Sequence, residues 1–184
     1  MEDREIVAEC QTGDFGQFGE LYDRYIDKIY KFIYLKTSNK QVAEDLTSDV
    51  FYKVLNSLSQ FDVNRVETSF KSWLYTIANN KIIDFYRTKK EHFDIEMCFD
   101  LSSHSDVLGD IDNKDKLQKI IEFLDTLKPD QKEIIILRIW EDLSYKEISE
   151  ITGKTLDNCK KIVSRGLINI KENFLLLLIF IFLF

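Results

Sequence analysis

Apolar residues recur at every third or fourth position along much of the first half of the chain, which is the spacing of amphipathic helices. The pattern predicts one helix over 15–35, a second over 41–58, and a third that begins near Phe70 and ends in a basic run at 87–90. In each segment the apolar residues form one stripe, while charged residues occupy the opposite side. Helices of this kind bury their apolar stripes against one another, so the pattern predicts a small helical bundle.

The chain changes character between 91 and 115, where acidic residues greatly outnumber basic ones and the apolar periodicity is lost. This composition is typical of a flexible linker. Helical periodicity returns over 117–127, stops at Lys128, and restarts with Pro129. Proline is tolerated in the first turn of a helix because the N–H that it lacks has no partner there. We therefore expect a second, compact set of short helices after the linker.

The segment 143–166 reads LSYKEISEITGKTLDNCKKIVSRG and predicts two helices separated by a glycine. Tyr145–Thr152 has the pattern of a short helix, Gly153 suits the left-handed turn that ends it, and Thr155 can cap a new helix. Helix, glycine turn and helix in this order are typical of a helix-turn-helix, whose second helix enters the major groove of DNA. On that second helix, the residues expected to face inward are Cys159, Ile162, Val163, Leu167 and Ile170.

The local charge of this segment supports DNA binding. The whole chain has a formal net charge of −7, yet five basic residues and a single acid, Asp157, lie between Thr152 and Lys171. Affinity for phosphates depends on the local surface and the counterions that it displaces, while acidic segments elsewhere suppress indiscriminate binding. We expect the free chain to bind DNA weakly. A generic helical hairpin with one basic surface helix is the alternative interpretation.

Composition narrows the fold class and the chemistry. With one proline, six glycines and 45% hydrophobic residues, the chain favours an all-helical fold. Three widely spaced cysteines argue against a disulfide framework, and the acidic start of the chain argues against a signal peptide, so we expect a cytoplasmic protein. The spacing of His92, Cys98 and His104 matches no zinc pattern, and no catalytic motif is present. We expect no metal, no cofactor and no enzymatic activity.

The segment Phe174–Phe184 reads FLLLLIFIFLF and holds no polar side chain. As a helix it would span roughly 16 Å, about half of the hydrocarbon core of a bilayer, so it cannot cross a membrane alone. Four interpretations stay open at this point: the segment packs on the second domain, lies at a membrane surface, binds a partner, or is the product of a shifted reading frame. Left exposed, it would promote aggregation.

Three ordered segments carry a resemblance to a known family. They are AEDLTSDVFYKVLNSLSQF at 43–61, FKSWLYTIANNKIIDFYRTKK at 70–90, and LKPDQKEIIILRIWEDLSYKEISEITGKTLDNCKKIVSRGL at 127–167. Together they resemble the extracytoplasmic-function (ECF) sigma factors of the sigma-70 family, which are dissociable subunits of bacterial RNA polymerase. The likeness covers roughly 15–173.

The resemblance implies an all-α fold with two small helical domains. The first is a sigma-2-like four-helix bundle at 1–90, and the second is a sigma-4-like helix-turn-helix domain at 116–173. A flexible acidic linker at 91–115 joins them, and the apolar tail at 174–184 is not a feature of the family. The implied function is to direct core polymerase to promoters and to assist DNA melting during transcription initiation. The implied partners are the polymerase core and promoter DNA, with an anti-sigma factor as a further candidate.

The resemblance also assigns three sets of site residues. The polymerase-binding set is Asp45, Leu46, Asp49 and Lys53. The set for the minus-ten element is Asn64, Trp73, Asn80, Lys81, Asp84 and Arg87, with the loop 62–68 receiving an unstacked base. The set for the minus-thirty-five element is Thr155, Asn158, Lys160, Lys161, Ser164 and Arg165. Considered without the family, the acids near 45 and 49 are ordinary helix N-terminal charges, and Trp73 is a core residue.

Two departures from the family pattern bear on promoter choice. Asn79 stands where the family often has arginine, and Asp157–Cys159 replaces a pair of small residues before a valine, so we expect an unusual base preference. Whether Lys160 or Arg165 reads a base stays open. Two rival functions are a stand-alone helix-turn-helix regulator, which would bind paired half-sites as a dimer, and a membrane-associated helical adaptor that uses the tail.

Overall fold

The computed structural model describes residues 1–65, 69–93 and 111–172, and in these ranges every regular element is a helix. The expected all-α fold class is thereby confirmed. The chain divides into two units, Met1–His104 and Ser105–Phe184, and each is described by itself. The core of the predicted linker, 94–110, and the apolar tail lie outside the described residues, as do Cys98, His104 and the side chain of His92.

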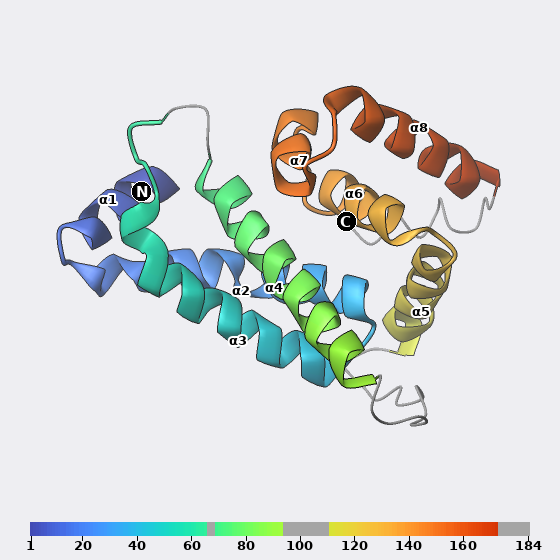
Figure 1. Ribbon diagram of the computed structural model, residues 1–184, viewed down its shortest axis with the longest axis horizontal. Helices are drawn as coiled ribbons and strands as arrows, with labels where there is room; N and C mark the ends of the chain where they lie inside the picture. Colours follow the sequence, from blue (N-terminus) through green and yellow to red (C-terminus); the bar gives the residue numbers. More distant parts are fainter. Residues whose placement is uncertain (66–68, 94–110, 173–184) are drawn as a thin grey trace. The chain divides into compact units, whose positions relative to one another are not determined.

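The first unit is built on three long helices, α2 (Phe18–Thr37), α3 (Lys40–Ser57) and α4 (Phe70–Phe93). All three pack against one another (Figure 1). The short 3₁₀ helices η1 (Phe15–Gln17) and η2 (Leu58–Gln60) precede α2 and follow α3. The fully buried side chains that hold the bundle together are Leu21, Ile29, Phe32 and Ile33 from α2, Val50 and Val54 from α3, and Leu74 and Tyr75 from α4.

A fourth helix, α1 (Asp3–Gln11), was not predicted from the sequence. It packs against α2 and both 3₁₀ helices and buries Ile6 and Val7 completely. Its start is tied to α2, because Asp3 accepts hydrogen bonds from Arg24 and from the hydroxyl of Tyr25. The unit is therefore a four-helix bundle in which α1 is fixed by both apolar and polar contacts.

The second unit contains α5 (Ile111–Asp125), α6 (Pro129–Ile139), α7 (Tyr145–Thr152) and α8 (Leu156–Glu172). Pro129 occupies the first turn of α6 as predicted. The helix α5 begins six residues before the predicted start at Leu117, so 111–115 is helical instead of linker. The helix α8 packs against both α6 and α7, and the shared core is formed by Ile120, Leu124, Ile134, Ile136, Leu137, Ile148 and Cys159.

Within the ranges that the structure describes, no helix is both long enough and apolar enough to cross a membrane. The same ranges contain no group of three histidine, cysteine or acidic side chains arranged to hold a metal ion.

Candidate promoter and polymerase interfaces

The helix-turn-helix of the second unit is defined by local capping. Ser144 Oγ accepts a hydrogen bond from the Glu147 amide at 3.3 Å, and the Glu147 carboxylate accepts one from the Ser144 amide at 2.9 Å. This reciprocal pair starts α7 by satisfying two amides that lack partners within the helix. The helix ends at Gly153, whose φ of +67° lies in the left-handed region that glycine adopts without steric cost. Both boundaries agree with the sequence prediction.

The turn between α7 and α8 is held by hydrogen bonds from both sides. Ser149 Oγ donates to the Lys154 carbonyl at 2.5 Å, and Lys154 Nζ donates to Asp130 Oδ2 at 2.7 Å. Thr155 Oγ1 then accepts from the Asn158 amide at 3.3 Å and caps α8, as predicted. The hydrogen bond to Asp130 raises the pKa of Lys154 above its ordinary value, against a smaller effect of burial that lowers it. Lys154 therefore stabilises the packing of the second unit, although it is one of the five basic residues between Thr152 and Lys171 that suggested DNA binding.

Fewer residues of α8 are buried than the sequence predicted. Cys159 and Val163 are buried, and Gly166 completes the stripe one turn later. A Cβ at Gly166 would lie 2.4 Å from Ile135 Cδ1, so any other residue here requires the buried Ile135 side chain to shift. Leu167, which we expected to face inward, is 38% exposed because Gly166 occupies the inward position beside it. Ile162 is half-buried, and the side chain of Ile170 lies outside the described residues.

The outer side of α8 presents the predicted minus-thirty-five residues. Thr155, Asn158, Lys160, Lys161, Ser164 and Arg165 are all exposed. Asn158, Lys161 and Arg165 follow one another at helical spacing and share one face, with Lys160 and Ser164 on the adjacent ridge. In the part of the chain that the structure describes, none of the three cations has an ion-pair partner. They are therefore available to phosphate oxygens or to base edges.

The predicted minus-ten residues on α4 are divided between the core and the surface. Trp73 is half-buried and packs against the rings of Phe61 and Phe70, with centroid distances of 5.5 and 5.9 Å. Its ring therefore supports the start of the loop that precedes α4. The exposed members of the set are Asn80, Asp84 and Arg87, which share one side of the helix, and Arg87 Nη2 lies 2.9 Å from Asp84 Oδ1.

Lys81, the remaining minus-ten residue on α4, points toward α3. Its Nζ lies 3.2 Å from Oδ2 of Asp49, a residue of the polymerase-binding set. The two sets therefore meet at one ion pair, which the sequence did not indicate. The loop residue Asn64 is exposed, and its amide donates to Asp62 Oδ1 at 2.9 Å in a side-chain-stabilised turn.

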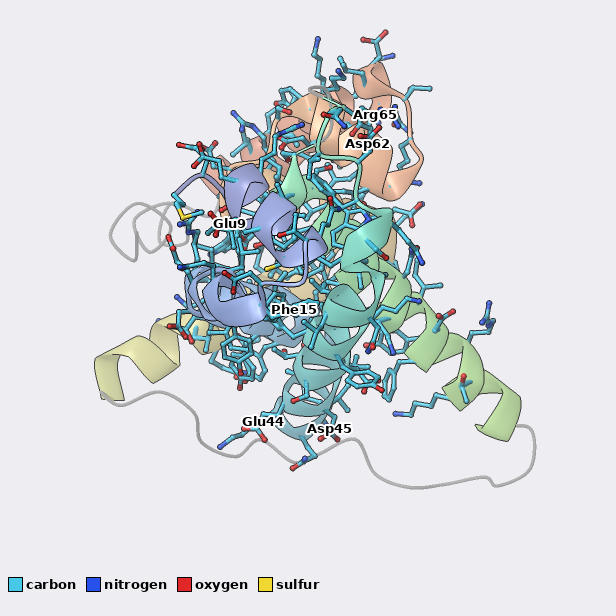
Figure 2. The ribbon with its side chains drawn as sticks, turned by 90° about the vertical axis from the view of Figure 1, so that its left-hand side faces the viewer. Glu9, Phe15, Glu44, Asp45, Asp62 and Arg65 are labelled. Atoms are coloured by element: carbon cyan, nitrogen blue, oxygen red, sulfur yellow. The ribbon has the colours of Figure 1, made fainter. Side chains whose placement is uncertain are left out.

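The loop 61–65 and the start of α3 lie at opposite ends of the first unit. Figure 2 shows Asp62 and Arg65 at one end, with Glu44 and Asp45 at the other. The 18 residues of α3 span about 27 Å between them. Arg65 is exposed and adds a cation beside the proposed base-receiving loop. No sequence pattern marks Arg65, because a single arginine in a polar connector has no periodicity; its only signal is its position next to Asn64.

The polymerase-binding set occupies the solvent side of α3, with one exception. Asp45, Asp49 and Lys53 are exposed, and Asp45 Oδ1 accepts a hydrogen bond from Gln41 at 3.1 Å. Leu46 is only 7% exposed and belongs to the core of the bundle, so it offers little area to a partner. Tyr52, which the sequence analysis did not single out, is 73% exposed on the same helix.

The departure at Asn79 lies inside the bundle. Asn79 is buried, and its Oδ1 accepts a hydrogen bond from Lys36 Nζ at 2.6 Å. The side chain therefore pairs α4 with the end of α2. An effect of this residue on base preference would have to act through that packing, because its side chain is withdrawn from the surface.

Comparison with known proteins places both units in one family. Sigma-70 region 2 matches residues 21–92, and Sigma-70 region 4 matches residues 117–170. The ECF RNA polymerase sigma factor BldN of Streptomyces coelicolor is 31% identical over 157 residues, which cover 82% of this chain and 57% of BldN. The RNA polymerase sigma factor YlaC of Bacillus subtilis is 30% identical over 163 residues, which cover 84% of this chain and 90% of YlaC.

A solved structure agrees in fold over most of both chains. The sigma factor RpoE in its complex with the anti-sigma factor NepR from Bartonella quintana superposes with a TM-score of 0.68 at 25% identity. The match covers 84% of this chain and 94% of RpoE. The two family regions in their expected order, a relative matched over 90% of its length and a shared fold together lead to one conclusion: the chain belongs to the ECF sigma factors of the sigma-70 family.

Proposed function

We propose that this sigma factor recruits bacterial core RNA polymerase through α3, opens the minus-ten element with α4 and the loop before it, and recognises the minus-thirty-five element with α8. The exposed face of α8 carries the proposal furthest. Lys160, Lys161 and Arg165 stand on it without a carboxylate partner among the described residues. The positive charge is concentrated on this face, whereas the chain as a whole has a net negative charge.

The division of labour between the two units follows from their surfaces. In the first unit, an acidic face on α3 suits a basic docking surface of the polymerase, and the turn at 62–65 offers polar groups to an unstacked base. Capturing that base in a protein site offsets the few kcal/mol of stacking that opening the duplex costs. The reaction needs no covalent step, so the protein acts by binding and not as an enzyme.

Two further assignments belong to the proposal. The protein acts in the cytoplasm, where core polymerase is found. An anti-sigma factor is a candidate partner, since the related RpoE forms a complex with the anti-sigma factor NepR. Neither the stand-alone regulator nor the membrane adaptor is favoured by any described feature, and membrane contact through 174–184 stays a prediction.

Reconstituted transcription tests the function. The purified chain is added to bacterial core polymerase that has been freed of sigma factors, together with a library of randomised promoters. We expect discrete start sites that share two conserved elements and that are absent without the added chain. A folded chain that neither binds core polymerase at micromolar concentration nor yields such transcripts would contradict the proposal.

A further inference from the structure

The guanidinium of Arg4 on α1 binds the backbone of the loop before α4. Its Nη1 donates to the Val63 carbonyl, and its Nη2 donates to the Arg65 carbonyl at 3.1 Å. A planar guanidinium can hold two acceptors at once in a fixed geometry, which a lysine ammonium cannot reproduce. One side chain therefore fixes the positions of two loop carbonyls that lie about sixty residues later in the chain.

Gln11, at the other end of α1, binds the entry to the same loop. Its Nε2 donates to the Leu58 carbonyl at 2.9 Å and to the Phe61 carbonyl at 2.7 Å. Both amide hydrogens are thereby used, and the Leu58 carbonyl also accepts the Phe61 amide at 3.1 Å at the end of η2. Together, Arg4 and Gln11 hold four carbonyls of the segment 58–65 from one short helix.

The helix that supplies these donors is itself anchored. Ile6 and Val7 are fully buried, and Asp3 is bonded to Arg24 and Tyr25 of α2. The contacts described between Arg4 or Gln11 and 58–65 go to backbone carbonyls, so they leave the exposed side chains of 61–65 at the surface. Those side chains are Asp62, Asn64 and Arg65.

We propose that Arg4 and Gln11 are positioning residues for promoter opening, which hold the loop 61–65 in the conformation that receives an unstacked base. The inference rests on the proposed function of this loop. A loop that is already ordered does not have to lose conformational freedom when the base enters, so more of the contact energy is left to favour the open strand. Without the two donors the loop still exists, but base capture must also order it.

The test compares Arg4→Lys, Arg4→Gln and Gln11→Glu with Lys31→Gln, a matched loss of an exposed cation on α2. Gln11→Glu removes both N–H donors and places a carboxylate opposite carbonyl oxygens. Backbone amide exchange in 61–65 is measured first, on the full chain. We expect exchange about tenfold faster in the three test variants, with unchanged exchange in the centres of α2 and α4. Core polymerase affinity should stay within about twofold of wild type.

Promoter opening is then followed on a promoter selected from the randomised library, with 2-aminopurine placed in the minus-ten element. We expect Arg4→Gln and Gln11→Glu to reduce opening about tenfold. A single-stranded minus-ten oligonucleotide with an abasic site at the captured position supplies the decisive comparison. The wild type and Lys31→Gln should lose affinity on base removal, while the test variants should lose much less, because they no longer present an ordered site.

The outcomes separate the inference from the function beneath it. If the wild type yields no promoter-dependent transcripts, the proposed function fails before any variant is compared. If the wild type transcribes and the test variants show the full abasic penalty, the positioning role is overturned. The positioning role would also be overturned if the variants lowered core binding, the unfolding midpoint and promoter opening together. That result would show that Arg4 and Gln11 stabilise the whole bundle. Arg4→Lys keeps the cation and its packing, so it tests the loop even if Arg4→Gln unfolds.

Discussion

Lys81 on α4 and Asp49 on α3 form an ion pair, with Nζ 3.2 Å from Oδ2. One residue belongs to the surface proposed for promoter DNA and the other to the surface proposed for polymerase. Both side chains are substantially exposed, at 32% and 59%, so the pair contributes at most about 1 kcal/mol to stability. The pair matters for its position, because it makes the two proposed surfaces neighbours at this point.

The two acids of α3 should therefore behave differently when neutralised. Asp45→Asn should weaken core polymerase binding alone, because Asp45 is bonded only to Gln41 on its own helix among the contacts described. Asp49→Asn should weaken core binding and also change promoter opening, because it releases Lys81. Fluorescence titration with core polymerase and opening assays at saturating holoenzyme separate the two effects. The prediction fails if Asp45→Asn and Asp49→Asn give the same pair of defects.

The cations of α8 should divide into base contacts and phosphate contacts. Arg165→Ala and Lys160→Ala are compared on selected promoters over a range of salt concentrations, with the exposed Lys119→Ala on α5 as the control. Loss of a base contact should cost about 1–3 kcal/mol at one promoter position. Loss of a phosphate contact should weaken all promoters alike and lower the salt slope by about one. Equal behaviour of both variants and the control would remove α8 from the DNA interface.

Replacing Gly166 with alanine should destabilise the fold, although alanine is the better helix former. A Cβ at this position meets Ile135 at 2.4 Å, so Gly166→Ala should destabilise the second unit by about 1–3 kcal/mol. Urea unfolding followed by Trp140 fluorescence in a Trp73→Phe background measures this. Ile135→Val deletes the clashing Cδ1 and should recover part of the loss.

Gly19 on α2 supplies the contrast, because a Cβ there meets nothing within 4 Å. Gly19→Ala should stabilise the first unit by up to about 1 kcal/mol. A loss of stability at Gly19 as large as that at Gly166 would show that the packing argument is wrong.

The Lys154–Asp130 pair should make the stability of the second unit fall as the pH becomes alkaline. The pKa of Lys154 is raised in the folded state from its ordinary value of 10.5, first by the hydrogen bond to Asp130. The stabilisation is thus fully present below pH 10.5 and is lost as the pH rises through the folded-state pKa. Lys154→Met should lower the free energy of unfolding by less than about 1 kcal/mol at neutral pH. This difference from wild type should shrink progressively above pH 10.5.

Urea unfolding at several pH values, again followed through Trp140, measures this dependence. Lys160→Met is the control, since Lys160 is exposed and has no ion-pair partner among the described residues. A difference between Lys154→Met and wild type that stays constant into strongly alkaline solution would contradict the assignment.

The helix-turn-helix could be predicted from sequence because local chemistry determines it. The bounds of α7, the turn at Gly153 and the cap at Thr155 each depend on residues within a few positions of one another. The start of α5 could not be found in this way, since 111–116 has few apolar residues and its acids suggested a linker. Apolar periodicity detects the buried part of a helix and misses a polar first turn.

Contacts between distant segments account for the other differences. Nothing in the sequence pairs Lys154 with Asp130 or Lys81 with Asp49, because each pair is formed by packing between helices. The short stripe of α1 was likewise overlooked, although Ile6, Val7 and Cys10 have helical spacing. The sequence suggests candidate site residues, and the fold decides which of their side chains are exposed.

The bonds from α1 to the loop also impose an order on folding. Arg4 is synthesised about sixty residues before Val63 and Arg65, whose carbonyls it binds. A nascent chain that has released α1 and α2 but not this loop lacks these two native acceptors for the Arg4 guanidinium. These hydrogen bonds close a loop of about sixty residues, so their formation has a high entropic cost and is expected late in folding. An ordered loop is thus a sign that the N-terminal bundle has been completed, and an unfinished chain is poorly equipped to open DNA.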